Sequence, residues 1–221
     1  MTTILHLDSS ARLQRSLTRK LSALFVESWR SHEPDARIIY RDLGRNPPAP
    51  VSEEWIAAAF TAPHERTPDM ERTLAPSDEM IEELSAANVI VLGAPMYNYG
   101  LPAALKAWVD QVVRVGRTFS FDLARGDFPV MPILVGKRFV VLSSRGEFGF
   151  ANGGPRDGWN HLNPHIRTIA TRLFGIPDSD IHEVAVEYQE FKDERHARSL
   201  EEAQERVLRL ATRLAEAVTK S

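Results

Sequence analysis

The residue types best suited to chemistry begin in a serine-rich segment that follows a short apolar run. Ser9 and Ser10 come after Ile4-Leu5-His6-Leu7-Asp8, and Ser16 and Thr18 lie where the next helix is expected to begin. A helix start presents free backbone N–H groups and a positive dipole end, and hydroxyls add donors, so this combination suits a phosphate. The alternative is structural, with Ser16 acting only as the helix cap. The nearby cations, which would add charge or lie in solvent, are Arg12, Arg15 and Arg19.

The kind of phosphate is narrowed by two motifs that the sequence lacks. The chain contains neither the P-loop pattern G-x-x-x-x-G-K-[ST] nor the dinucleotide pattern G-x-G-x-x-G. A hydroxyl-rich loop without a glycine pair therefore fits a terminal phosphate monoester better than a nucleoside triphosphate.

A second polar segment, Met96-Tyr97-Asn98-Tyr99, follows the most apolar run of the chain, Val89 to Ala94. Two tyrosines beside an asparagine offer a flat aromatic surface together with amide hydrogen bonds. A ring system with an apolar body and a polar edge, such as isoalloxazine, needs both. The alternative is that the tyrosines only cover the edge of a sheet.

These segments must be positioned by a framework of alternating strands and helices. Apolar runs predict five strands, at residues 4–7, 37–43, 89–94, 138–143 and 181–186. Apolar faces at helical spacing predict helices at residues 17–29, 77–84, 102–115 and 160–174, and a last helix that begins with a capping box of Ser199 and Glu202. Residues 44–76 are expected to form a long connection with a helical piece around 54–60, and residues 119–136 an irregular insertion.

Strands that alternate with helices predict one doubly wound α/β domain over residues 1–221. In such sheets ligands bind beyond the carboxyl ends of the strands, at the point where the strand order reverses. The loops after the first, third and fourth strands should therefore form the site, and the unusual polar segments lie in these loops.

Composition excludes several classes of function. A net charge of −3 without a long basic run makes nucleic acid or an anionic membrane an unexpected partner. The absence of cysteine excludes disulfides, thiolate metal sites and thiol catalysis. The first apolar stretch is too short for a signal peptide or a membrane span, so we expect a cytoplasmic protein.

The run A-P-M-Y-N-Y-G-L-P-A-A-L-K-A-W-V-D, residues 94–110, resembles a stretch of the FMN-dependent NADH azoreductase and quinone reductase family. Further similar motifs occur in the same order over roughly residues 3 to 215. They are Asp8-Ser9-Ser10, Ser16 to Thr18, Ser144-Arg145-Gly146 and Phe174-Gly175-Ile176. The resemblance implies a flavodoxin-like fold, with a five-stranded parallel sheet in the order 2-1-3-4-5 and helices on both faces.

The resemblance also implies a binding role for particular residues. Ser10, Ser16, Leu17 and Thr18 would hold the FMN phosphate, and Met96, Tyr97, Asn98 and Tyr99 would line the isoalloxazine ring. Ser144, Arg145, Gly146 and Glu147 would meet the pyrimidine edge of the ring.

The sequence departs from the family pattern at three places. These departures bear on the preference for an acceptor and on individual contacts with the cofactor. Glu147 stands where a second glycine is usual, and a carboxylate beside N1 and O2 would disfavour the anionic reduced ring, so we expect Glu147 to point away or to lower the potential. Residues 122–134 are longer than the usual family loop. Leu17 replaces a polar residue and offers only its backbone N–H.

The activity implied by the resemblance is hydride transfer from NADH to FMN, followed by two-electron reduction of a quinone or azo compound, with ping-pong kinetics. The flavin carries this chemistry, so no catalytic acid–base pair is required from the protein. The family also implies a homodimer, in which residues 120–135 and 148–163 help to wall the partner's cleft.

The sequence also allows other interpretations. A flavodoxin-type electron carrier is the main alternative, although such carriers are typically shorter and more acidic, and an FMN reductase that releases its flavin is a third. His161 and His165 are four residues apart, but Pro164 lies between them and no third metal ligand is evident. Lys106 and Asp110 fit an i, i+4 ion pair as well as a cofactor contact.

Overall fold

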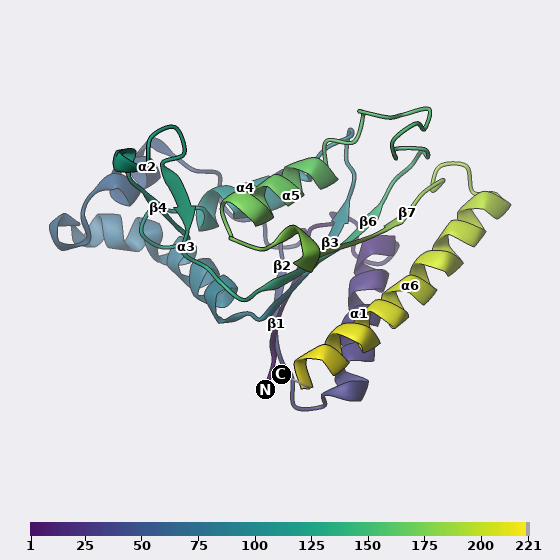
Figure 1. Cartoon of the computed structure of the whole chain (residues 1–221). Coiled ribbons are helices and arrows are strands. Elements are labelled where there is room, and N and C mark those ends of the chain that lie inside the picture. Colours follow the sequence, from purple (N-terminus) through teal and green to yellow (C-terminus); the bar gives the residue numbers. More distant parts are fainter. Residues whose placement is uncertain (220–221) are drawn as a thin grey trace.

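The computed structural model describes residues 1–219, and its centre is a five-stranded sheet (Figure 1). All neighbouring strands of this sheet pair in parallel, in the order β2-β1-β3-β6-β7. This is the predicted order 2-1-3-4-5, counted over the strands of this sheet, and it confirms the predicted flavodoxin-like arrangement. The strands are β1 (Thr3–Asp8), β2 (Arg37–Asp42), β3 (Val89–Pro95), β6 (Arg138–Ser144) and β7 (Ile181–Val186).

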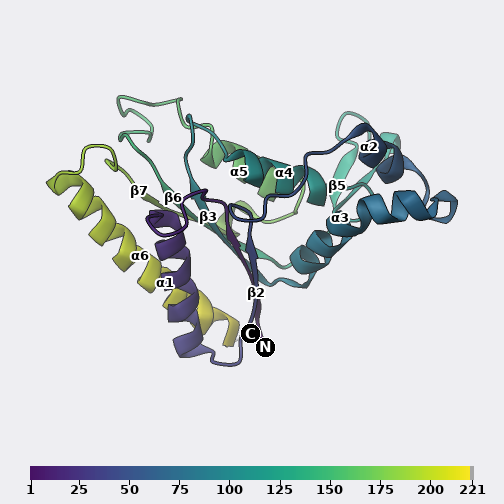
Figure 2. The same cartoon turned by 180° about the vertical axis from the view of Figure 1, so that it is seen from behind.

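Helices cover both faces of the sheet (Figures 1 and 2). The helices α1 (Leu17–His32) and α6 (Glu194–Thr219) pack on one face. The other face is covered by α3 (Pro68–Ala86), α4 (Ala103–Val112) and α5 (Asn163–Arg172). Every residue of β3 is buried, as a central strand between two helical layers requires.

Two predicted helix starts were wrong, because contacts distant in the sequence decide the role of each serine. Ser77 does not begin α3; its hydroxyl donates to the Gln111 carbonyl at 2.5 Å, while Thr67 caps the helix and Pro76 lies inside it. Ser199 lies within α6, where its hydroxyl accepts a hydrogen bond from the Glu187 N–H at 2.9 Å.

The segment between α4 and β6 is more regular than predicted. It contains an antiparallel pair of short strands, β4 (Phe119–Phe121) and β5 (Val130–Pro132). The helical piece expected around 54–60 is present as α2 (Glu53–Phe60). Within residues 1–219 there are also three short 3-10 helices, at Pro63–Glu65, Leu123–Arg125 and Asp178–Asp180.

No helix in the described part of the chain is both long and apolar enough to span a membrane.

Candidate functional site

A pocket lies at the carboxyl ends of β1, β3 and β6, where the strand order reverses. It brings together residues from all three predicted loops: Ser10, Ser16, Leu17, Met96, Tyr97, Ser144 and Gly146. Its other lining residues are Arg12, Pro95, Gln189 and Glu190. The topology therefore gathers residues that are more than a hundred positions apart in the sequence at one end of the sheet.

The segment from Ser9 to Ser16, called the serine loop here, ends at the first turn of α1. Ser16 caps this helix, because its hydroxyl accepts a hydrogen bond from the Arg19 N–H at 3.3 Å. The capping role and the pocket-lining role of Ser16 thus coexist. The backbone N–H groups of the first turn, including those of Leu17 and Thr18, have no carbonyl partner within the helix. They and the hydroxyls of Ser10 and Ser16 make this corner of the pocket a place for an anion.

The sequence left open whether Arg19 adds positive charge to the pocket. In the structure it does not. Its guanidinium makes two hydrogen bonds to the Asp42 carboxylate, at 2.8 and 2.5 Å. It also donates to the carbonyls of Ser10, at 2.8 Å, and Arg12, at 3.1 Å. Arg19 therefore fixes the backbone of the serine loop from behind.

The acidic partners around Arg19 stay ionised. Burial alone would raise the pKa of Asp8, but His6, Ser22 and Arg19 together hold that pKa below its ordinary value of 3.8. Burial opposes ionisation of Asp42 as well, and the hydrogen bonds from Arg19 outweigh it, so the pKa of Asp42 is also lowered. Burial and the neighbouring carboxylates raise the pKa of Tyr40 to about 12, so its phenol remains a donor to Asp8.

The tyrosine segment forms a tight turn that is joined to the serine loop. Tyr97 and Gly100 exchange both backbone hydrogen bonds, at 3.1 and 2.9 Å, with Asn98 and Tyr99 between them. The Tyr97 hydroxyl accepts a hydrogen bond from the Ala11 N–H at 3.2 Å. One side chain therefore connects the two loops predicted to hold opposite ends of a ligand.

Two pocket residues, Gln189 and Glu190, were missed by the sequence reasoning. They follow β7, and their N–H groups donate to the carbonyls of Arg145, at 3.2 Å, and Gly146, at 3.0 Å. Gly146 fits this packing because a Cβ there would lie 2.8 Å from Cγ of Glu190. Their place in the chain could have indicated them, because the loop after the fifth strand begins at the same edge of the sheet.

Five of the predicted residues do not line the pocket: Thr18, Asn98, Tyr99, Arg145 and Glu147. The Thr18 side chain is buried behind Ser16, and the two hydroxyls lie 3.1 Å apart. The Arg145 guanidinium binds Glu187 at 3.0 Å and Asn163 at 2.9 Å. Glu147 pairs with Arg156 and accepts a hydrogen bond from the Tyr99 hydroxyl at 2.9 Å. Binding roles for these five residues remain predictions.

The hydrogen-bond donors and side chains that line the pocket suit FMN. The serine hydroxyls and the first turn of α1 suit the phosphate, and the pocket side of the tyrosine turn, with Met96 and Tyr97, suits the ring. Across from them, Ser144 and Gly146 leave room for a polar ring edge because neither carries a large side chain. When bound, FMN supplies the hydride chemistry, and the protein supplies its binding and orientation.

One other sequence feature has a structural explanation. Lys106 and Asp110 form the expected i, i+4 ion pair, at 2.5 Å. Among residues 1–219, no group of three or more His, Asp or Glu side chains is arranged to hold a metal ion.

Comparisons with known proteins agree with this geometry. Residues 2–210 match the model of a family described by its flavodoxin-like fold. The chain is 47% identical, over 228 residues, to FMN-dependent NADH:quinone oxidoreductase 2 of Idiomarina loihiensis, covering 100% of this chain and 94% of that protein. It is 40% identical, over 212 residues, to FMN-dependent NAD(P)H:quinone oxidoreductase 1 of Pseudomonas aeruginosa, covering 96% and 99% of the two chains.

A solved FMN-dependent NADH-azoreductase from Bacillus anthracis, in complex with FMN, has a TM-score of 0.84 at 18% identity, covering 97% of this chain and 100% of that one. At that identity the likeness shows the fold alone. The family match and the close full-length relatives go further: the chain belongs to the family of proteins with a flavodoxin-like fold.

Proposed function

We propose that this protein is an FMN-dependent oxidoreductase that takes electrons from NADH and reduces quinones and azo compounds. The observation that carries the proposal is the pocket at the carboxyl ends of β1, β3 and β6, which pairs an anion corner with the side chains of Met96 and Tyr97. Relatives at 47% and 40% identity, named as FMN-dependent quinone oxidoreductases, support the same activity.

The protein's own task in this reaction is binding and orientation. The first turn of α1 and the hydroxyls of Ser10 and Ser16 would hold the phosphate, and Tyr97 would lie along the ring. An open cleft beside Tyr97 would let flat donors and acceptors stack at reacting distance in turn, which fits ping-pong kinetics.

Stopped-flow mixing of the yellow protein with NADH, and then with a series of quinones, tests the proposal. Rapid bleaching by NADH and recolouring by a quinone are the expected results. Bound flavin that NADH does not bleach would instead favour the electron carrier, which the named relatives do not support. Flavin lost on gel filtration would favour an FMN reductase, and a parallel run with NADPH measures the preference between the two donors.

A homodimer is part of the proposal. Apolar side chains on and beside the β4–β5 pair are strongly exposed, among them Leu123 at 75%, Phe128 at 80% and Val135 at 79%. Exposed apolar patches of this kind mark interfaces, and a second copy of the chain is the proposed occupant. The cytoplasmic location expected from the sequence remains a prediction.

A further inference from the structure

Tyr99 has a strained backbone in the turn beside the pocket. Asn98 and Tyr99 have φ angles of 48° and 66°, which places both in the left-handed region. A two-residue turn of this kind requires that conformation at both positions. Asparagine adopts it readily, whereas an aromatic residue there is strained and needs compensating contacts.

The compensating contacts of Tyr99 all come from residues 147–161. Its hydroxyl donates to Glu147 at 2.9 Å, and its carbonyl accepts from the His161 N–H at 2.9 Å. Its ring meets Trp159 edge-on, with centroids 5.7 Å apart, and Phe150 at 6.3 Å. A strained residue is thus held by one neighbouring loop.

Arg156 completes this arrangement. It pairs with the Glu147 carboxylate, and its guanidinium donates to the Phe148 carbonyl at 3.1 Å and lies over the Phe148 ring at 5.0 Å. The Glu147 carboxylate therefore has two donors, Arg156 and Tyr99, both away from the pocket. This explains how a carboxylate is accommodated next to Gly146.

The segment 148–161 is the long loop between β6 and α5 in Figure 1. It contains four glycines, of which Gly149, Gly153 and Gly158 have φ between 75° and 79°. The segment follows directly on Gly146 and Glu147 and contacts Tyr99, so it lies next to two pocket-lining positions, Gly146 and Tyr97. Tyr99 provides one set of its anchoring contacts; the Phe148 ring also stacks on Tyr188 at 4.5 Å, and the Gly149 N–H donates to Glu187 at 3.1 Å.

We propose that Tyr99, Glu147 and Arg156 form a latch that fixes segment 148–161 beside the pocket and thereby limits the size of the acceptor admitted. The three are positioning residues. The inference rests on the proposed function for its consequence, but the latch itself is a property of the protein alone.

The variants Tyr99→Phe and Glu147→Gln test the latch, because each removes one hydrogen bond and keeps the shape. Trypsin cleavage after Arg156 should accelerate roughly tenfold in both, since a bond to a charged group is lost. Per bound FMN, kcat/KM for a bulky azo dye should rise relative to that for a small benzoquinone. Glu205→Gln is the control: it breaks the exposed Glu205–Arg209 pair, at 3.1 Å on α6, and should change neither readout.

The outcomes separate the two proposals. Cleavage at the wild-type rate in both variants would overturn the latch, whatever the protein binds. Faster cleavage with an unchanged preference between the two acceptors would overturn its role in acceptor size. A protein that takes up no FMN would instead overturn the proposed function and leave the cleavage test of the latch in force.

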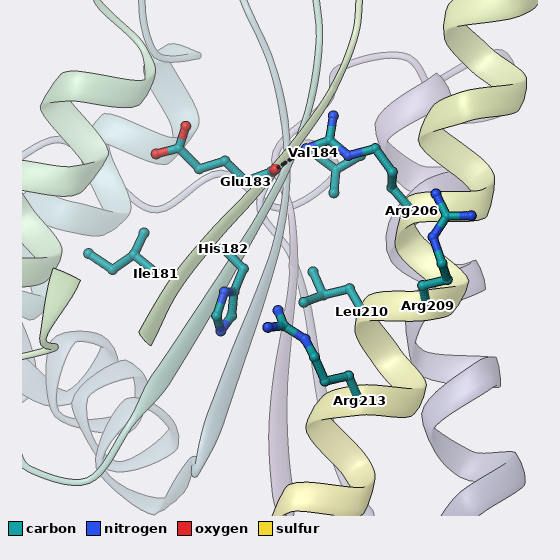
Figure 3. Close-up of a pocket in the computed structure, with 8 residues that line it drawn as sticks. All are labelled: Ile181, His182, Glu183, Val184, Arg206, Arg209, Leu210 and Arg213. Atoms are coloured by element: carbon teal, nitrogen blue, oxygen red, sulfur yellow. Dashed lines mark hydrogen bonds between the residues drawn. The ribbon is translucent and has the colours of Figure 1, made fainter. Parts of the chain in front are cut away.

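A separate observation concerns a basic groove between the open edge of β7 and α6 (Figure 3). Arg206, Arg209 and Arg213 lie along one side of α6 and His182 and Val184 lie on β7. Arg206 bonds the Glu183 carbonyl at 3.1 Å, while the Glu183 carboxylate turns to the other side of the sheet.

The arginine side chains of this groove are only partly neutralised by carboxylates of the described residues. Arg209 pairs with the Glu205 carboxylate, whereas Arg206 donates to the Glu183 carbonyl and has no carboxylate partner among the described residues. Nε2 of His182 is buried without a hydrogen-bond partner in the described structure, and Figure 3 shows the Arg213 guanidinium directed toward this imidazole. Arg206 and Arg213 begin about 10 Å apart along the helix axis, so their side chains could meet around an extended anion.

We infer that this groove binds a small diphosphate-bearing anion. Calorimetric titration with pyrophosphate should show saturable binding that weakens at least fivefold in an Arg206→Gln/Arg213→Gln variant. An Arg30→Gln/Arg72→Gln variant carries the same charge change on α1 and α3 and should bind as the wild type does. Inorganic phosphate and ADP, titrated alongside, distinguish a single phosphate from a nucleotide diphosphate. No binding by the wild type, or equal weakening in both variants, would overturn the inference.

Discussion

At the residue scale, Arg19 shows how a side chain outside the pocket can decide what the pocket binds. Its guanidinium holds the carbonyls of Ser10 and Arg12 and is itself held by Asp42. In Arg19→Gln these charged hydrogen bonds are lost and the serine loop loosens. We expect the Kd for FMN to rise about tenfold.

Arg41→Gln is the matched control for Arg19→Gln. Arg41 also lies in an ion pair, with Glu83 at 2.6 Å, but away from the serine loop. Both variants should lose stability in chemical denaturation, and only Arg19→Gln should lose FMN affinity in a fluorescence titration. Equal FMN affinities in the two variants would contradict the positioning role of Arg19.

The carboxylates of the same network predict a loss of stability in acid. The pKa values of Asp8 and Asp42 are lower in the folded chain than the ordinary value of 3.8. Their ionised forms therefore stabilise the fold fully above that pH, and the stabilisation is lost as the pH falls below it. The free energy of unfolding, measured between pH 7 and pH 3, should fall less steeply in Asp42→Asn than in the wild type. Parallel curves would contradict this assignment.

At the element scale, the start of α1 combines a structural and a binding role, and these can be separated. Ser16 and Ser52 cap α1 and α2 in the same way, each accepting from the N–H three residues on, at 3.3 and 3.2 Å. Substitution of either by alanine should cost about 1 kcal/mol of stability. Ser16→Ala should also weaken FMN binding several-fold, and Ser52→Ala should not. If the two variants bind FMN equally, the start of α1 is not the phosphate site.

The elements also show how far sequence reasoning reaches. The five strands of the main sheet were predicted because each is a short apolar run between polar segments, and Val89–Pro95 is the clearest case. The starts of α3 and α6 were missed because Ser77 and Ser199 carry the residue type of a cap but bond distant backbone groups. Local sequence cannot distinguish the two uses of a serine hydroxyl.

The residues of the site likewise include some that the sequence predicted and some that it did not. Residues in loops of unusual composition, such as Ser10 and Tyr97, were predicted and do line the pocket. Gln189 and Glu190 were not, because their segment has no distinctive composition and reaches the pocket only through its pairing with Arg145 and Gly146. Glu147 was expected to point away from the ring or to lower its potential; its carboxylate bonds Arg156 and Tyr99, and its role toward the flavin stays a prediction.

At the scale of the whole molecule, the exposed apolar surface around β4 and β5 predicts self-association. Phe128 and Val135 are 80% and 79% exposed, so charges at these positions are compatible with the folded monomer. The variant Phe128→Asp/Val135→Asp should sediment as a monomer where the wild type sediments as a dimer. Leu208→Asp, at a position 43% exposed on α6, is the control and should remain dimeric. A wild type that sediments as a monomer would contradict the prediction.

The central claim is that the serine loop and the tyrosine turn bind the two ends of one FMN molecule. Titration of flavin-free protein with FMN, followed by flavin fluorescence, tests it most directly, with riboflavin as the ligand that lacks the phosphate. The account predicts one FMN bound per chain, and riboflavin binding at least a hundredfold weaker because the charged hydrogen bonds at the start of α1 are absent. No uptake of FMN, or equal affinities for FMN and riboflavin, would contradict it.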